Sequence, residues 1–94
     1  MGMVLETTAH IAKSYPSITK VVLFGSRARG THTETSDYDI CTYGANSTDF
    51  TNFSFDVDDM DTFYKIDVLC FETITNNLLQ QEILRDGVTI YERT

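Results

Sequence analysis

Four short apolar segments alternate with helical segments along this chain, and this alternation limits its fold more than any other feature. The apolar segments are rich in β-branched and aromatic residues, which is typical of strands. They are KVVLF (20–24), DYDICTY (37–43), KIDVLCF (65–71) and VTIYE (88–92). Strands separated by helices pack as layers around a shared core. The pattern therefore predicts an α/β (α+β) fold, in which helices pack on a β-sheet, although it leaves the strand directions open.

The segments before the first strand and before the last strand carry the clearest helical patterns. Apolar residues at helical spacing predict one helix over 3–14 and another over 76–86. Gly87 is expected to be the C-cap of the second helix. The side chains expected to face the core from that helix are those of Leu78, Leu79 and Ile83.

The acidic segment 46–62 gives a weaker signal and predicts only a short helix. It carries Phe50, Phe53 and Phe55 between its charged residues. These aromatic side chains could contact a base or a partner, but packing in the core is the favoured interpretation.

Length and charge limit the class of protein. The chain has 94 residues, with seven basic and fourteen acidic side chains and a formal net charge of −7. This length is expected to form one domain over 1–94. The acid excess argues against binding of long nucleic acid, which requires basic residues. No apolar segment approaches the ~20 residues of a membrane span. Cys41 and Cys70 lie in apolar segments without metal-site spacing, so we expect buried, reduced thiols in a cytoplasmic protein.

Three aspartates lie in or beside predicted strands, where a lone carboxylate is costly. Asp37 and Asp39 are two residues apart, so their side chains share one face of a strand. Asp67 lies within the most apolar strand. A divalent cation such as Mg²⁺ or Mn²⁺ would stabilise all three carboxylates. Taken singly, Asp37 could cap a turn, and Asp67 could pair with Lys65 or with an arginine.

A Gly-Ser pair ends the first predicted strand, at Gly25 and Ser26. Gly25 would let a ligand approach the backbone closely, and Ser26 is expected to cap a short helical turn. A helix start is a favourable place for phosphate, and Arg27 and Arg29 would add positive charge near a polyphosphate. An ordinary glycine turn with a serine cap is the alternative. The aspartates on the next strand favour the phosphate site.

The segments VVLFGSRARG, SDYDI, KIDVLCF and EILRDGVTIYER form one pattern that covers nearly the whole chain. A hydrophobic strand ends in Gly-Ser, Asp-x-Asp follows on the next strand, and a third Asp lies on a later strand. This pattern resembles the nucleotidyltransferase superfamily that includes DNA polymerase β. The resemblance is closest to the minimal nucleotidyltransferases, single small domains related to kanamycin nucleotidyltransferase. It implies a mixed β-sheet with the polymerase β palm-like fold.

The resemblance also implies a reaction, in which a nucleoside monophosphate moves from an NTP to a hydroxyl and pyrophosphate is released. Two Mg²⁺ ions are expected, with Mn²⁺ as an alternative. The implied phosphate-binding residues are Gly25, Ser26, Arg27 and Arg29. The implied catalytic metal ligands are Asp37, Asp39 and Asp67, of which Asp67 would also help to deprotonate the attacking hydroxyl.

Small nucleotidyltransferases of this kind resemble the antitoxins of HEPN–MNT toxin–antitoxin pairs. That resemblance implies transfer of AMP from ATP to a tyrosine of a HEPN ribonuclease partner. Two alternatives remain open: an antitoxin that binds its partner without catalysis, and an enzyme that modifies a small hydroxylated molecule such as an aminoglycoside. Larger family members carry an added helical domain for the acceptor, so here we expect a partner protein, a second subunit or a small molecule. The final strand, 88–92, could also pair with a second copy of the chain.

Overall fold

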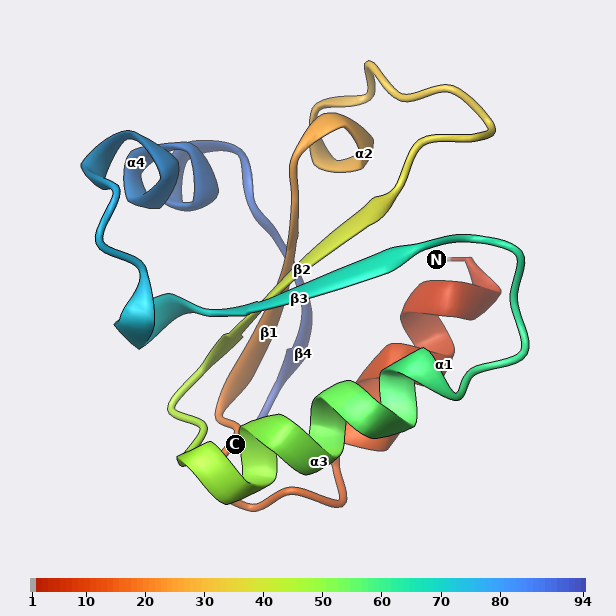
Figure 1. The fold of residues 1–94 in the computed structure, drawn as a ribbon. Helices are drawn as coiled ribbons and strands as arrows, with labels where there is room; N and C mark the ends of the chain where they lie inside the picture. Colours follow the sequence, from red (N-terminus) through yellow and green to blue (C-terminus); the bar gives the residue numbers. More distant parts are fainter. Residues whose placement is uncertain (1) are drawn as a thin grey trace.

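Four strands form one sheet with helices on both faces in the computed structural model, which describes residues 2–94 (Figure 1). The elements in chain order are α1 (Met3–Ala12), β1 (Lys20–Phe24), α2 (Ser26–Arg29), β2 (Tyr38–Tyr43), α3 (Ser47–Asp58), β3 (Ile66–Cys70), the 3₁₀ turn η1 (Phe71–Thr73), α4 (Asn77–Asp86) and β4 (Val88–Glu92). The strand order is β3-β2-β1-β4. β2 and β3 are parallel, whereas β1 is antiparallel to both β2 and β4. The expected fold of helices packed on a mixed sheet is confirmed.

Helices α1 and α3 cover one face of the sheet and lie side by side (Figure 1). Each presents buried residues four positions apart, which share one side of a helix. These are Val4, Thr8 and Ala12 of α1, and Phe53 and Val57 of α3. The sheet supplies the alternate residues of its strands to this core, namely Val21, Leu23, Ile40, Ile66 and Ile90.

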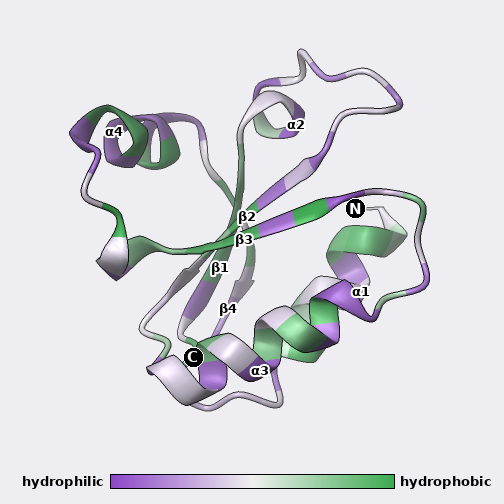
Figure 2. Ribbon diagram, in the orientation of Figure 1, coloured by the Kyte–Doolittle hydropathy of each residue, from purple (hydrophilic) through white to green (hydrophobic). Residues whose placement is uncertain are grey.

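The opposite face of the sheet is only partly covered, by α4. Val22, Phe24 and Cys41 pack there against Ile83 of α4. Polar residues interrupt the apolar ones in β2 and β3, as the purple segments of Figure 2 show. Because α4 covers only part of this face, the N-terminal parts of β2 and β3 are left open to a ligand.

Helix α4 differs from the sequence expectation in the direction of one leucine. Ile83 is buried and Leu79 is partly buried, but Leu78 is 76% exposed. Leu79 and Ile83 are four residues apart and share one side of the helix, whereas Leu78 is rotated by about 100° from Leu79. The expectation that Leu78 faces the core was therefore wrong. Gly87 is the C-cap, as expected.

The acidic segment forms a longer helix than its composition indicates, because its start is well capped. Asn46 accepts a hydrogen bond from the backbone N–H of Asp49 at 2.7 Å, and α3 then continues for 12 residues. Phe53 is fully buried and Phe50 is partly buried, but Phe55 is 68% exposed, so core packing was the wrong expectation for Phe55.

Both cysteines are buried and free, as expected. No helix within residues 2–94 is long and apolar enough to cross a membrane.

Candidate functional site

The turn between β1 and α2 has a backbone conformation that requires glycine. Gly25 has φ 76° and ψ −156°, a region that other residues essentially do not adopt. A Cβ at this position would overlap Oδ2 of Asp39 and would lie 3.2 Å from its Cγ. Gly25 is the N-cap of α2, and the helix begins at Ser26. No side chain forms a capping hydrogen bond at this helix start. The expectation that Ser26 caps the helix was wrong, and its hydroxyl is therefore not engaged as a cap.

Asp39 and Asp67 lie directly beside each other on neighbouring strands. They occupy paired positions in the parallel β2–β3 register, so their side chains share one face. By alternation along β2 and β3, this is the face that α4 partly covers, on which Cys41 and Leu69 also lie. Asp39 is in addition paired with Phe24 of β1, which places it next to Gly25.

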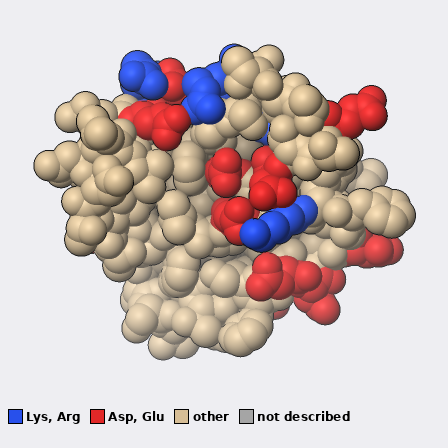
Figure 3. All heavy atoms as spheres, turned by 45° about the horizontal axis from the view of Figure 1, so that its top comes forward, with Lys and Arg blue, Asp and Glu red and all other residues tan. Residues whose placement is uncertain are grey.

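The electrostatics of this cluster disfavour the ionised form of Asp39. Burial raises the pKa of Asp39, and the charges of Asp67, Asp37 and Glu82 raise it further, while Arg29 lowers it. Figure 3 shows acidic side chains gathered in the hollowed centre of this face with one basic side chain beside them. Carboxylates that repel one another in this way favour a divalent cation between them.

The carboxylates nevertheless do not form a ready-made metal site. Within residues 2–94, no three carboxylate, imidazole or thiol groups converge on one point closely enough to hold an ion. The donor set is of the oxygen type that Mg²⁺ and Mn²⁺ prefer, and the ligands that remain on such ions are commonly water or substrate phosphate. The residues therefore suit a metal that binds together with a phosphate ligand.

An open cleft of about 590 Å³ brings most of the predicted site residues together. We call it the Asp39 cleft. It is lined by Phe24, Gly25, Ser26, Arg29, Asp39, Asp67, Val68, Leu69 and Glu82. Asp37, the exposed residue directly before β2, does not line this cleft. It is nevertheless near enough to Asp39 for its charge to raise the pKa of Asp39.

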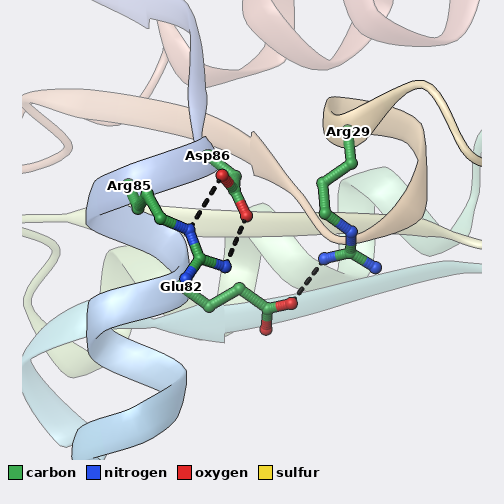
Figure 4. Close-up of polar contacts among 4 residues, drawn as sticks. All are labelled: Arg29, Glu82, Arg85 and Asp86. Atoms are coloured by element: carbon green, nitrogen blue, oxygen red, sulfur yellow. Dashed lines mark hydrogen bonds and ion pairs between the residues drawn. The ribbon is translucent and has the colours of Figure 1, made fainter.

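Glu82 of α4 is a cleft residue that the sequence did not reveal. Its carboxylate forms an ion pair with Arg29, and Figure 4 shows the two side chains pointing toward each other. The next helical turn carries a separate pair, Arg85 with Asp86. Glu82 and Arg29 are 53 residues apart, and no local pattern indicates such a contact.

Arg27 lies away from the cleft that holds Arg29. Its guanidinium is 4.0 Å from the ring centre of Tyr38 and 4.9 Å from that of Tyr64. Its Nε donates a hydrogen bond to the carbonyl of Ser36 at 3.0 Å, and its Nη2 donates to the carbonyl of Glu34 at 3.3 Å. The structure thus does not bring Arg27 together with the other predicted phosphate ligands. Arg27 instead holds the segment that leads into β2.

The second interpretation of Asp67, an ion pair with Lys65, is also present. The two side chains are 3.7 Å apart at their closest polar atoms, and Lys65 is 71% exposed. An exposed pair of this kind contributes about 0–1 kcal/mol. It therefore does not bind Asp67 firmly enough to keep it from another ligand.

Residues 6–94 match the model of the family described as "Polymerase beta, Nucleotidyltransferase". Three solved structures show the same fold. A toxin–antitoxin structure with AMP-PNP is 17% identical with TM-score 0.69, covering 96% of this chain and 74% of that one. The toxin–antitoxin MntA-HepT is 14% identical with a TM-score of 0.62, and the match covers 97% of this chain and 72% of that one. A protein from Sulfolobus solfataricus, described as a candidate nucleotidyltransferase, is 22% identical with a TM-score of 0.55. The match covers 99% of this chain and 91% of that one.

No curated protein matches the chain. The family match and the shared fold confirm the expected polymerase β-like architecture with its mixed sheet.

Proposed function

The chain belongs to the polymerase beta nucleotidyltransferase family and is a nucleotidyltransferase, and from this premise we propose that it transfers AMP from ATP to a protein hydroxyl and releases pyrophosphate. One observation carries the proposal. Asp39 and Asp67 lie at paired strand positions in the same cleft as the Gly25–Ser26 turn. Groups suited to phosphate and groups suited to a metal ion are thus neighbours.

In this proposal the Gly25–Ser26 turn and Arg29 bind the phosphates of ATP. Gly25 and Ser26 both line the cleft, and the hydroxyl of Ser26 is available as a donor to a phosphate oxygen. Arg29 would turn from Glu82 toward the β- and γ-phosphates of ATP and hold them. Negative charge that develops on the leaving pyrophosphate is then stabilised beside a fixed cation.

Asp39 and Asp67 would hold the metal ions, and Asp37 would complete their ligands from the entrance of the cleft. When bound, Mg²⁺ neutralises phosphate charge and lowers the pKa of the attacking hydroxyl; two ions are expected and Mn²⁺ is an alternative. Asp67 accepts the proton of the acceptor hydroxyl. The hydroxyl oxygen forms a bond to the α-phosphorus, and the bond from that phosphorus to the bridging oxygen of pyrophosphate breaks.

The acceptor in this proposal is a tyrosine of a HEPN-type toxin in the cytoplasm, so the chain acts as an antitoxin. Two of its structural neighbours are toxin–antitoxin complexes, and one of these contains AMP-PNP. The open sheet face beside Asp67 leaves room for a large acceptor. The net charge of −7 also favours a basic, RNA-cleaving partner.

A labelling experiment tests this function. The chain is mixed with ATP labelled on the α-phosphate, Mg²⁺ and the protein encoded beside it, together with an Asp37→Asn/Asp39→Asn control. We expect label on a tyrosine of the partner with the native chain and none with the control. Absence of label with all four NTPs, while the two proteins still bind, would contradict transfer and favour an antitoxin that acts by binding alone. Label on an added aminoglycoside would instead favour a small acceptor.

A further inference from the structure

The outer edge of β3 carries backbone groups that no strand pairs. β3 is the terminal strand of the order β3-β2-β1-β4. The carbonyl of Lys65 accepts a hydrogen bond from Tyr38 N–H at 2.9 Å, which fixes the pattern of this parallel pair. In a strand, the backbone groups of every second residue point toward the same adjacent strand. Lys65 and Asp67 therefore face β2, whereas Ile66 and Val68 turn their N–H and C=O groups away from it. Within residues 2–94, no turn, loop or side-chain hydrogen bond uses these groups. An added strand could therefore pair here.

A groove of about 510 Å³ follows the same edge on the side of α3. We call it the β3 groove. Its apolar lining includes Val57, Met60 and Ile66, and Asp58 lines it from the end of α3. Asp67 and Val68 line both this groove and the Asp39 cleft. The edge of β3 is therefore the boundary between the two hollows.

The rim of the β3 groove is acidic and aromatic. The segment 56–61 contains four aspartates and no basic residue, and one of them, Asp58, lines the groove together with Asp67 and a single cation, Lys65. Figure 3 shows acidic side chains gathered on the surface below the central cluster. Phe63 is fully exposed and Tyr64, which lines the groove, is 38% exposed. This charge and this apolar surface complement a segment that carries basic and aliphatic side chains.

We propose that the edge of β3 docks an extended, basic segment of the partner protein and thereby delivers its hydroxyl residue to Asp67; this inference rests on the proposed function. Successive side chains of an extended segment point to opposite faces. A residue that faces the Asp39 cleft therefore has both its neighbours facing the β3 groove. The preferred acceptor sequence is thus a hydroxyl residue with a basic or long aliphatic residue on either side.

A second copy of this chain is a poorer occupant of the same edge. Each copy has a net charge of −7, so two copies of the chain repel each other on close approach. Like charges that face each other across an interface disfavour association. The acidic rim therefore selects against self-pairing and in favour of a basic partner.

Peptide binding without nucleotide tests the docking surface separately from catalysis. The probes are short labelled peptides with a central tyrosine, flanked on both sides by Lys in one set and by Glu in the other. We expect binding of the Lys set only, together with slower hydrogen exchange at the amides of Ile66 and Val68. Asp58→Lys should weaken binding about tenfold, as loss of one close charge pair would. Glu92→Lys makes the same charge change on the opposite edge strand, β4, and should leave binding unchanged.

Three results would overturn the docking surface. The first is equal binding of the Lys and Glu peptides, and the second is equal weakening of binding by Asp58→Lys and Glu92→Lys. The third is that, without peptide, hydrogen exchange at the amides of Ile66 and Val68 slows as the protein concentration rises. The last result would assign the edge to a second copy of the chain. Transfer of AMP to the bound peptide is measured afterwards, with ATP and Mg²⁺. Edge binding without transfer would contradict the proposed function and leave the docking surface standing.

Discussion

The carboxylate of Asp39 occupies the space in which any other residue at position 25 would carry its Cβ. The Cγ of Asp39 lies 3.2 Å from that point, and Oδ2 lies closer still. The contact arises because Phe24 and Asp39 are paired across β1 and β2, so the next residue of the chain turns directly over the carboxylate. The glycine of the Gly-Ser pair thus serves both the phosphate turn and the position of the acidic cluster.

Replacement of Gly25 by alanine should therefore destabilise the protein and displace Asp39. A non-glycine residue at φ 76° and ψ −156° costs about 1–3 kcal/mol, and overlap with Asp39 adds to this cost. Urea unfolding measures the loss. Gly30→Ala is the control, because Gly30 also has a positive φ, 78°, but a Cβ added there would meet no atom within 4 Å. Gly30 lies in the left-handed helical region, at ψ 14°, so equal losses in the two variants would show that neither the contact with Asp39 nor the more restricted backbone region of Gly25 adds to the cost of a positive φ.

Removal of one carboxylate from the cluster should abolish transfer without loss of stability. Burial and the neighbouring charges raise the pKa of Asp39, so ionisation of this carboxyl costs more free energy in the folded protein than in the unfolded chain. Asp39→Asn and Asp67→Asn should lower the rate at least about 100-fold, since even supporting residues of a metal site contribute 10–100-fold. Thermal unfolding should show equal or higher stability for Asp39→Asn. A variant that keeps its activity would remove that aspartate from the metal site.

The strands, and several of the residues that line the Asp39 cleft, could be predicted from the sequence because both depend on local patterns. The alternation of apolar segments marks β1 to β4, and Asp-x-Asp on a strand sets a shared face whatever the topology. Contacts between distant segments have no such local sign. The pairing of Glu82 with Arg29 depends on how α4 crosses the sheet, and the position of Arg27 depends on two tyrosines that lie 26 residues apart in the chain.

Arg27 and Arg29, which the sequence treats alike, should respond differently to the same substitution. Arg27 stacks on Tyr38 and Tyr64 and donates to two loop carbonyls, so Arg27→Lys loses planar contacts that lysine cannot replace. We expect a loss of about 1–2 kcal/mol in unfolding free energy and little change in the KM for ATP. Arg29→Lys should raise the KM for ATP with little effect on stability. The reverse outcome would return Arg27 to the phosphate site.

The ion pair between Glu82 and Arg29 should compete with ATP for the arginine. Both side chains are about one-third exposed, and a pair of this kind contributes up to about 1 kcal/mol. Glu82→Gln should therefore lower the KM for ATP by up to about fivefold. Asp86→Asn removes the same charge from the same helix but breaks the neighbouring pair with Arg85 (Figure 4), so it serves as the control. A higher KM for Glu82→Gln would indicate that Glu82 supports the metal or the nucleotide directly.

The buried thiol of Cys41 should make the protein less stable in alkaline solution. Burial raises the pKa of Cys41 from 9.0 to about 12, with a smaller contribution from Glu72. Between these two pH values the unfolded chain loses this proton while the folded chain keeps it, so the free energy of unfolding falls as the pH rises. Urea unfolding under reducing conditions across pH 9–12 measures this slope. Cys41→Ala should make the slope shallower, although the raised pKa values of Cys70 and Tyr43 leave part of it in place. An unchanged slope would show that the Cys41 thiol ionises as readily in the folded chain as in the unfolded one.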